Sequence, residues 1–400
     1  MSKYFEGGPQ LNKRRTTYRP YLLIPVIVVM IFAVCFVGRK GEADVNFGAT
    51  RYLSRAALKH ITPDMIDAYG LSIDGDLQRY IAATVRKYRV SFGAVAVMDA
   101  YNGDILALYG KDHGGEDCGI PLDAFLAASV FKIVTASAAI ERGMTPLSPV
   151  TYRGSPYTLY KGQLEARDDR WSQQITLAQA FAKSNNVVFG KLGTHYLGEH
   201  PILLEAMRLG FWKPVMRECW SEPSAVFIPE SQYNLAEMAC GFNHETRMSP
   251  VHAAQIISAV VNGGRMVTPR LLRTLDVEST RVMNDAKAES MRFMMAETLK
   301  TGTYANGFKA CKYDRVMKEL ELGAKSGSID SRNPDGRLNW FVGYAEHPER
   351  GAITIACLLV RDSFYLIKAD DMARMIIKQY FMEHGLLAMK PRGGASHRFN

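Results

Sequence analysis

The run from Ala127 to Ile140 constrains the fold more than any other stretch of this sequence. It reads Ala-Ala-Ser-Val-Phe-Lys-Ile-Val-Thr-Ala-Ser-Ala-Ala-Ile, with Lys132 as its one charged residue. Apolar or small residues on almost every side predict a helix that is buried all round. A buried lysine is costly unless it is paired or its pKa falls. Ser129 lies on the same helical face, three positions earlier. Such a pair can make a nucleophile; the alternative is a surface lysine at a frayed helix end.

Composition places the 400 residues among core-forming proteins, because 47% of them are hydrophobic. The net charge is +9, and residues 1–20 contribute +4 of it, with five basic residues and one acidic residue. We find no basic stripe interleaved with aromatic residues, so nucleic-acid binding is not expected. The six cysteines form no C-x-x-C pair, which argues against metal and thioredoxin-like sites. Cys35 lies in an apolar run, so at least one of the other five is expected to be free.

An uninterrupted apolar run extends from Tyr21 to Val37. At about 1.5 Å per residue, it is at the short end of what crosses about 30 Å of hydrocarbon. A cleaved signal peptide is the alternative, but the run is long and no A-x-A site follows it. We predict an uncleaved transmembrane helix over residues 21–38. Because the denser basic cluster precedes this helix, the tail over 1–20 is expected in the cytoplasm and everything after Arg39 outside.

The rest of the chain is predicted to hold a juxtamembrane connector over 39–71, one domain over 72–387 and a disordered tail over 388–400. Tyr101-Asn-Gly103 is a strong hairpin signal between two strands. The predicted strands are 92–99, 104–109, 322–328, 339–345 and 352–360. The main predicted helices are one that ends near Tyr88, then 127–140, 175–183, 251–261 and 369–384. This order predicts an α/β (α+β) fold, in which an antiparallel sheet of about five strands carries helices on both faces and a large helical insertion.

Three short motifs follow one another in a set order. They are Ser129-Val-Phe-Lys132, Ser184-Asn185-Asn186 and Lys325-Ser326-Gly327-Ser328. The order matches the Ser-x-x-Lys, Ser-x-Asn and Lys-Thr-Gly trio of the serine–lysine acyltransferases, with serine for threonine in the third motif. On these motifs, residues 72–387 resemble the transpeptidase domain of high-molecular-mass, monofunctional (class B-like) penicillin-binding proteins. Flanking segments add to the resemblance: Asp74–Arg79, Ser249–Ala254, Asn262–Gly264 and Trp340–Tyr344.

The resemblance implies catalytic roles for three residues. Ser129 would be the nucleophile and Lys132 its general base. Lys132 can be neutral near pH 7 only if burial and the positive charge of Lys325 lower its pKa from about 10.4. Ser184 would relay protons to the leaving group. Each of these residues also has a purely structural explanation, such as a helix-capping role for Ser184.

The resemblance also implies the substrate-binding residues. Asn186 would contact the substrate amide, and Lys325 with Ser326 would hold the carboxylate of a D-alanyl terminus or a β-lactam. Gly327 and Ser328 complete this third motif. The developing oxyanion would lie between the backbone N–H groups of Ser129 and Ser328. One local question is open: Ala127-Ala128 could extend the helix upstream and tie up the N–H group of Ser129.

Three other matches are weaker. Lys300-Thr-Gly-Thr303 fits the third motif more literally, but it ends a helical stretch, whereas Lys325 lies in a strand that is followed by Trp340. Ser331-Arg-Asn333 is too close to Lys325 to form a separate wall of the site. His244-Glu245 lacks the second histidine of a zinc protease, since Met248 occupies that position. We therefore predict no metal and no cofactor.

The resemblance implies a D,D-transpeptidase of the bacterial cytoplasmic membrane. It would form an acyl-enzyme at Ser129 with the D-Ala-D-Ala stem peptides of peptidoglycan, cross-link them and bind penicillin covalently. A separate membrane glycosyltransferase is expected to supply the glycan strands. One alternative is a D,D-carboxypeptidase or β-lactamase, in which water replaces the acceptor amine. The long interval between Ser184 and Lys325 favours the transpeptidase. A further alternative is a non-catalytic cell-wall scaffold or β-lactam sensor.

Overall fold

The structure is a computed structural model that describes residues 46–47, 50–166, 169–361 and 366–386. Within these ranges no helix combines the length and the apolar character needed to cross a membrane. The predicted transmembrane helix over 21–38, the basic tail before it and the predicted C-terminal tail over 388–400 lie outside the described residues.

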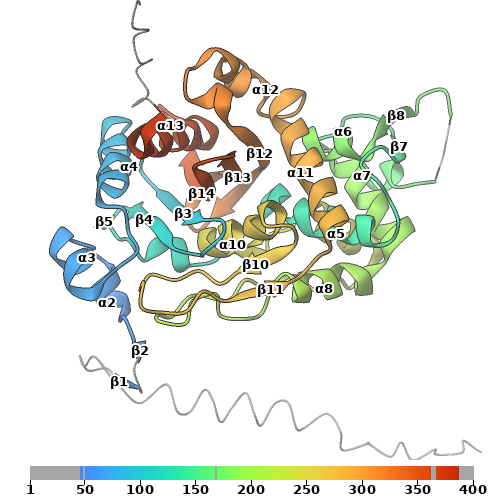
Figure 1. Ribbon diagram of the computed structural model, residues 1–400. Helices are drawn as coiled ribbons and strands as arrows, with labels where there is room; N and C mark the ends of the chain where they lie inside the picture. The colour runs from blue at the N-terminus through green and yellow to red at the C-terminus, as the bar shows by residue number, and fades with distance from the viewer. Residues whose placement is uncertain (1–45, 48–49, 167–168, 362–365, 387–400) are drawn as a thin grey trace, which may run out of the picture. The chain divides into compact units, whose positions relative to one another are not determined.

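The centre of the domain is a six-stranded antiparallel sheet with the strand order β12-β13-β14-β3-β4-β5 (Figure 1). Its strands are β3 (Gly93–Asp99), β4 (Ile105–Asp112), β5 (Gly115–Glu116), β12 (Glu321–Arg332), β13 (Asp335–His347) and β14 (Gly351–Arg361). Segments more than two hundred residues apart in sequence, β3 and β14, therefore pair in the middle of the sheet. The third motif lies on β12, which is an edge strand.

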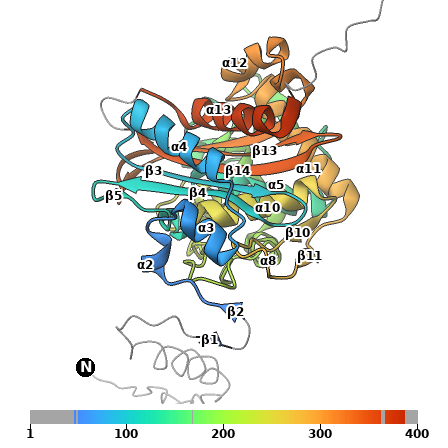
Figure 2. The same cartoon turned by 60° about the vertical axis from the view of Figure 1, so that its left-hand side comes forward.

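Both faces of the sheet are covered. Helices α4 (Gly75–Lys87) and α13 (Ala369–Phe381) lie on one face, and α10 (Pro250–Val261) lies on the other (Figure 2). Along β14, alternate side chains enter the two cores, Ile355 toward α13 and Ala356 toward α10. Because neither face meets water, the strands are continuous apolar runs rather than alternating ones.

The remaining elements surround this core. The other helices are α2 (Arg55–Leu58), α3 (Pro63–Tyr69), α5 (Lys132–Glu141), α6 (Leu177–Ala182), α7 (Asn186–Lys191), α8 (Glu199–Arg208), α9 (Gln232–Cys240), α11 (Asp285–Lys300) and α12 (Ala305–Phe308). The small strands pair as β1 (Asn46–Phe47) with β2 (Thr50–Arg51), β6 (Phe125–Leu126) with β9 (Arg247–Met248), β7 (Pro149–Tyr152) with β8 (Gln173–Thr176), and β10 (Arg265–Val267) with β11 (Ser279–Arg281). Several short turns are 3₁₀ or π helices. Two of them, η3 (Ala128–Phe131) and η8 (Met382–Leu386), lie within segments that were predicted as α-helices.

The five predicted strands are confirmed, and the structure corrects their number and bounds. A sixth strand, β5, has only two residues and pairs with the end of β4. The predicted strand over 322–328 is too short, because β12 continues to Arg332 as one arm of a hairpin with β13. The predicted helix over 175–183 is wrong at its start. Residues 173–176 pair with β7, and Thr176 then caps α6 by accepting from the N–H of Gln179 at 3.1 Å.

The helix predicted over 127–140 is divided into η3 and α5, and the one over 369–384 into α13 and π-helical η8. In the predicted connector, Leu53, Leu58 and Leu71 are buried against sheet residues such as Met98. The last part of that segment thus contributes to the core, while the boundary at residue 71 stays a prediction.

Candidate active site

Ser129 lies in the first turn of a helix that changes type. Residues Ala128–Phe131 form η3, and α5 begins at Lys132. Ala128 has a φ of 49°, in the left-handed region, through which a right-handed helix cannot continue. The helix therefore begins at Ala128 and does not extend upstream through Ala127. The N–H group of Ser129 is one of the first-turn donors that find no acceptor within their own helix.

Two close approaches hold this turn in place. Gly241 ends α9 with a φ of 68°, and a Cβ atom there would lie 2.0 Å from the carbonyl oxygen of Ala128. On the other side, a Cβ atom at Gly327 would lie 3.0 Å from Cγ2 of Val130. These two glycines let η3 fit between the end of α9 and the edge strand β12. Trp340 adds a hydrogen bond from its Nε1 to the carbonyl oxygen of Leu126, at 3.0 Å.

Lys132 is fully buried and points its amine at Ser129. Its Nζ donates to Ser129 Oγ at 2.7 Å, to Asn186 Oδ1 at 2.8 Å and to the carbonyl oxygen of Cys240 at 2.7 Å. Burial lowers the pKa of Lys132 to about 8. About a tenth of such an amine is neutral at pH 7, compared with well under a thousandth of an ordinary lysine. The structure therefore places an amine of lowered pKa within proton-transfer distance of the serine hydroxyl.

Lys325 is the second fully buried lysine of the site. Its Nζ donates to Ser184 Oγ at 3.0 Å and to the carbonyl oxygen of Ser326 at 2.9 Å. Burial, and then the charge of Lys132, hold the pKa of Lys325 well below its usual range. The sequence suggested that Lys325 would lower the pKa of Lys132. In the structure burial is the first cause that lowers the pKa of both lysines, and the repulsion between their two charges acts in the same direction.

The second motif is positioned by an unusual turn between α6 and α7. Ser184 has a φ of 56°, and Asn185 caps α7 by accepting from the N–H of Val188 at 3.0 Å. Asn186 is therefore the first residue of α7. Its Nδ2 donates to the carbonyl oxygen of Tyr157 at 3.0 Å, which leaves Oδ1 as the acceptor for Lys132. Each group in the motif thus has one fixed orientation.

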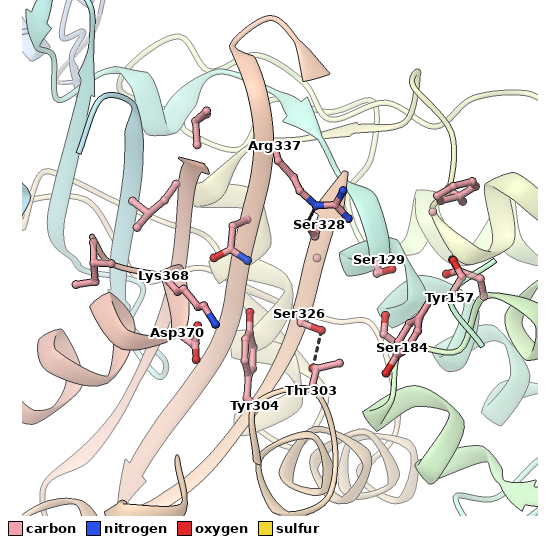
Figure 3. Close-up of a pocket in the computed structure, with 18 residues that line it drawn as sticks. Ser129, Tyr157, Ser184, Thr303, Tyr304, Ser326, Ser328, Arg337, Lys368 and Asp370 are labelled. Carbon is pink, nitrogen blue, oxygen red and sulfur yellow. Dashed lines mark hydrogen bonds between the residues drawn. The ribbon is translucent and has the colours of Figure 1, made fainter. Parts of the chain in front are cut away.

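These motifs open onto one cavity of about 350 Å³. The residues of the three motifs that line it are Ser129, Ser184, Asn186, Ser326, Gly327 and Ser328. Figure 3 shows the hydroxyl groups of Ser129 and Ser184 on one side of Ser326. The two lysines lie beneath this lining, with no exposed surface. All eight residues singled out in the sequence are therefore brought together.

Thr303 is a site residue that the motif search did not select. Its Oγ1 lies 2.7 Å from Ser326 Oγ, and it lines the cavity from the loop after α11 (Figure 3). Its backbone N–H donates to the carbonyl oxygen of Ala182 at 3.1 Å, which ties this loop to the segment before Ser184. The sequence signal that could have identified Thr303 is the segment Lys300-Thr-Gly-Thr303, which fits the third motif literally. Lys300 itself is exposed at the end of α11 and does not line the cavity.

The other matches lie apart from the cavity. Ser331 accepts a hydrogen bond from the N–H of Asn333 at 3.2 Å within the β12–β13 hairpin, and His244 is exposed. Within the described ranges, no three His, Cys, Asp or Glu side chains come together in a way that could hold a metal ion. The five cysteines of these ranges are buried, free thiols.

Comparisons with known proteins agree with this geometry. Residues 93–377 match the model of the penicillin-binding protein transpeptidase domain. The chain is 26% identical over 251 residues to the penicillin-binding protein PbpB of Mycolicibacterium smegmatis, covering 58% of this chain and 38% of that protein. It is 24% identical over 284 residues to the probable peptidoglycan D,D-transpeptidase FtsI of Caulobacter vibrioides, covering 66% and 46%. The chain thus spans less than half the length of these two relatives.

Solved structures show the same fold at low sequence identity. The transpeptidase domain of penicillin-binding protein 3 from Burkholderia pseudomallei superposes with a TM-score of 0.62 at 20% identity, covering 78% of this chain and 96% of that one. PBPA from Mycobacterium tuberculosis gives 0.61 at 17% identity, covering 79% and 81%. The resemblance expected from the three motifs is confirmed over most of the chain. The protein belongs to the penicillin-binding protein transpeptidase family.

Proposed function

We propose that this chain is a serine D,D-transpeptidase of peptidoglycan. One observation carries the proposal: a fully buried amine, with a pKa lowered to about 8, lies 2.7 Å from Ser129 Oγ. Family membership supports the same reaction. In addition, penicillin-binding protein A of M. tuberculosis, which shares this fold, has been solved as a penicillin G acyl-enzyme complex.

In the first half of the reaction, Ser129 Oγ attacks the carbonyl carbon between the two terminal D-alanines. Neutral Lys132 takes the hydroxyl proton as the new C–O bond forms. The N–H groups of Ser129 and Ser328 would stabilise the oxyanion, the first as a free first-turn donor and the second on the edge strand β12. The C–N bond then breaks. Ser184 Oγ delivers a proton to the departing amine, and the proton held by Lys132 replaces it, so that Lys132 is neutral again.

Substrate binding uses the opposite wall of the cavity. The terminal carboxylate would accept hydrogen bonds from Ser326 and Thr303, whose hydroxyls form one pair, with Lys325 behind them. An anion at this position raises the pKa of Lys325 and favours its charged form. Asn186, held by Tyr157, would bind the substrate amide. In the second half, an amine of a neighbouring stem peptide attacks the ester carbonyl, and neutral Lys132 takes its proton. The ester C–O bond then breaks, and Lys132 returns the proton to Ser129 Oγ.

Membrane location and partners are further parts of the proposal. The apolar run from Tyr21 to Val37 supports an anchor that keeps the catalytic domain outside the cytoplasm. A separate membrane glycosyltransferase would then supply the glycan strands. Protease added to intact spheroplasts tests the topology. It should digest the domain and leave the N-terminal tail protected, and protection of the whole chain would refute an external domain.

Fluorescent penicillin tests the reaction. The purified protein should form a covalent, slowly hydrolysed adduct, and Ser129→Ala should abolish it. Ser331→Ala, in the β12–β13 hairpin away from the cavity, is the matched control and should label normally. Labelling of Ser129→Ala at the wild-type rate would refute the nucleophile assignment. Rapid hydrolysis of the adduct would favour the β-lactamase alternative, and release of D-alanine without cross-linking would favour a carboxypeptidase.

A further inference from the structure

The cavity continues past the three motifs to the other side of the β12 edge. Beyond Ser326 it is lined by Asn339 of β13 and by Lys368 and Asp370 at the start of α13. Figure 3 shows Lys368 and Asp370 close together, with Ser326 between them and Ser129. None of these three residues belongs to a catalytic motif. We call this part of the cavity, defined by Asn339, Lys368 and Asp370, the α13 arm.

Asp370 is an unusual lining residue because it is a buried carboxylate that forms no ion pair with another described residue. It is 8% exposed, and its carboxylate makes no ion pair and no side-chain hydrogen bond with another described residue. Burial is the main cause that raises the pKa of Asp370, followed by repulsion from Asp371. The backbone N–H of Asp370 itself is the one hydrogen-bond donor to this carboxylate among the described residues, and a buried carboxylate with so few donors is costly. The charge that would satisfy it is positive.

A role in stabilising α13 does not account for this arrangement. Acidic residues favour the first turn of a helix, and both Asp370 and Asp371 lie there. Asp371, however, pairs with Arg374 at 3.0 Å and does not line the cavity. The cap of α13 is also satisfied without Asp370, since the N–H of Ala369 donates to Asn339 Oδ1 at 2.9 Å. Asp370 and Asp371 therefore lie in the same helix turn, but only Asp370 lines the cavity.

The groups around Asp370 restrict the ligand. Lys368 is exposed, lines the same arm and forms no ion pair with another described residue. The phenol of Tyr304 donates to the carbonyl oxygen of Trp340 and so does not supply a hydrogen bond to Asp370. The arm thus offers one anionic and one cationic group, two residues apart, at the end of a cavity that starts at the nucleophile. This pattern is complementary to a ligand that carries an ammonium and a carboxylate together.

We propose that the α13 arm is a specificity subsite for a zwitterionic amino-acid head group on the side chain of a stem peptide, with Asp370 binding the ammonium and Lys368 the carboxylate. The inference rests on the proposed function, since it takes the peptide bound at Ser129 to be a stem peptide. A diamino-diacid residue in the peptide carries such a head group. A lysine residue in the same position offers only the ammonium, and its acetylated form offers neither charge.

Competition with fluorescent penicillin tests this subsite. Three pentapeptides ending in D-Ala-D-Ala, with diaminopimelate, lysine or Nε-acetyllysine as third residue, are titrated against the labelling rate of Ser129. The wild type should need about a tenfold lower concentration of the diaminopimelate peptide than of the acetyllysine peptide. One charge-assisted hydrogen bond to a desolvated carboxylate strengthens binding by about this factor. The lysine peptide should lie between them.

Two matched variants locate the effect. Asp370→Asn should abolish the advantage of the lysine peptide over the acetyllysine peptide and reduce that of the diaminopimelate peptide. Asp371→Asn, which removes the same charge from the same turn, should keep the wild-type order. Penicillin labelling without competitor should be unchanged in both. Equal competition by the three peptides in the wild type, or an unchanged order in Asp370→Asn, would overturn the subsite. The wild-type comparison decides the matter even if Asp370→Asn does not fold. Absence of any penicillin labelling in the wild type would instead refute the proposed function.

Discussion

The lowered pKa of Lys132 makes the rate of acylation depend on pH in a defined way. With a pKa of about 8, the neutral fraction of this amine is about 1% at pH 6, 9% at pH 7, 50% at pH 8 and 91% at pH 9. If neutral Lys132 is the base, the rate constant for acylation by penicillin rises about tenfold between pH 6 and pH 7 and levels off near pH 9. An unshifted lysine would instead continue to gain about tenfold per unit past pH 9.

The assay is the second-order rate constant of labelling by fluorescent penicillin, measured from pH 6 to pH 10. Lys132→Arg provides the decisive variant, because a guanidinium stays protonated throughout this range. It should lose about 10²–10⁴ in rate, which is the usual contribution of a general base. What remains should be independent of pH below pH 9.

A second buried lysine could produce the same profile, so Lys325 needs its own control. Lys325→Arg keeps the charge and should lower the rate without moving the inflection near pH 8. An inflection that disappears in Lys325→Arg would assign the titration to that residue. A wild-type rate that is flat from pH 6 to pH 9 would refute the argument that burial activates Lys132.

Three further predictions concern the surroundings of the site. Thr303→Val should slow acylation by about tenfold through loss of one hydroxyl contact, and Thr303→Ser should restore the rate; equal rates in both would exclude the hydroxyl. Gly241→Ala should lower the free energy of unfolding in urea by about 2 kcal/mol or more, because its Cβ would lie 2.0 Å from the oxygen of Ala128. Lys287→Met should lower it by about 3 kcal/mol, because Lys287 pairs with Glu205 at 2.7 Å and both are 2% exposed.

The last two predictions share an exposed control. Arg281 pairs with Asp285 at 3.1 Å on the surface, so Arg281→Met should change the free energy of unfolding by less than about 1 kcal/mol. If Lys287→Met were no more destabilising than Arg281→Met, the buried pair would not be holding α11 to α8. If Gly241→Ala unfolded at the wild-type urea concentration, the close packing of α9 against η3 would be wrong.

Local spacing explains why so much of the site could be predicted from the sequence. Ser129 and Lys132 are three residues apart on one helix, so their contact follows from helical geometry alone. The strands were recognisable because residues such as Ile355 and Ala356 remain apolar on both faces. The order of the three motifs then predicted that distant segments of the chain meet in one site, which hydrophobic periodicity alone could not predict.

What the sequence did not predict depends on contacts between distant segments. The left-handed conformation of Ala128 is imposed by its neighbours, since alanine has no local preference for it. The sequence pattern of residues 175–176 favours a helix, but pairing with β7 makes residues 173–176 a strand. Asp370 looked like an ordinary acidic residue in the first turn of a helix, and only the fold reveals that it faces the cavity.

The end of α9 serves the nucleophile and the base at once. Gly241 lies against the backbone of Ala128, and the carbonyl oxygen of Cys240 accepts from Lys132. A shift of this helix end would therefore move both partners of the proton transfer in the same direction. Thr303, on the opposite wall, is hydrogen-bonded to Ser326 and to Ala182 rather than to Ser129 or Lys132. Substitutions selected for drug resistance should accordingly accumulate on that wall, where the shape of the cavity can change while the chemistry of acyl transfer stays intact.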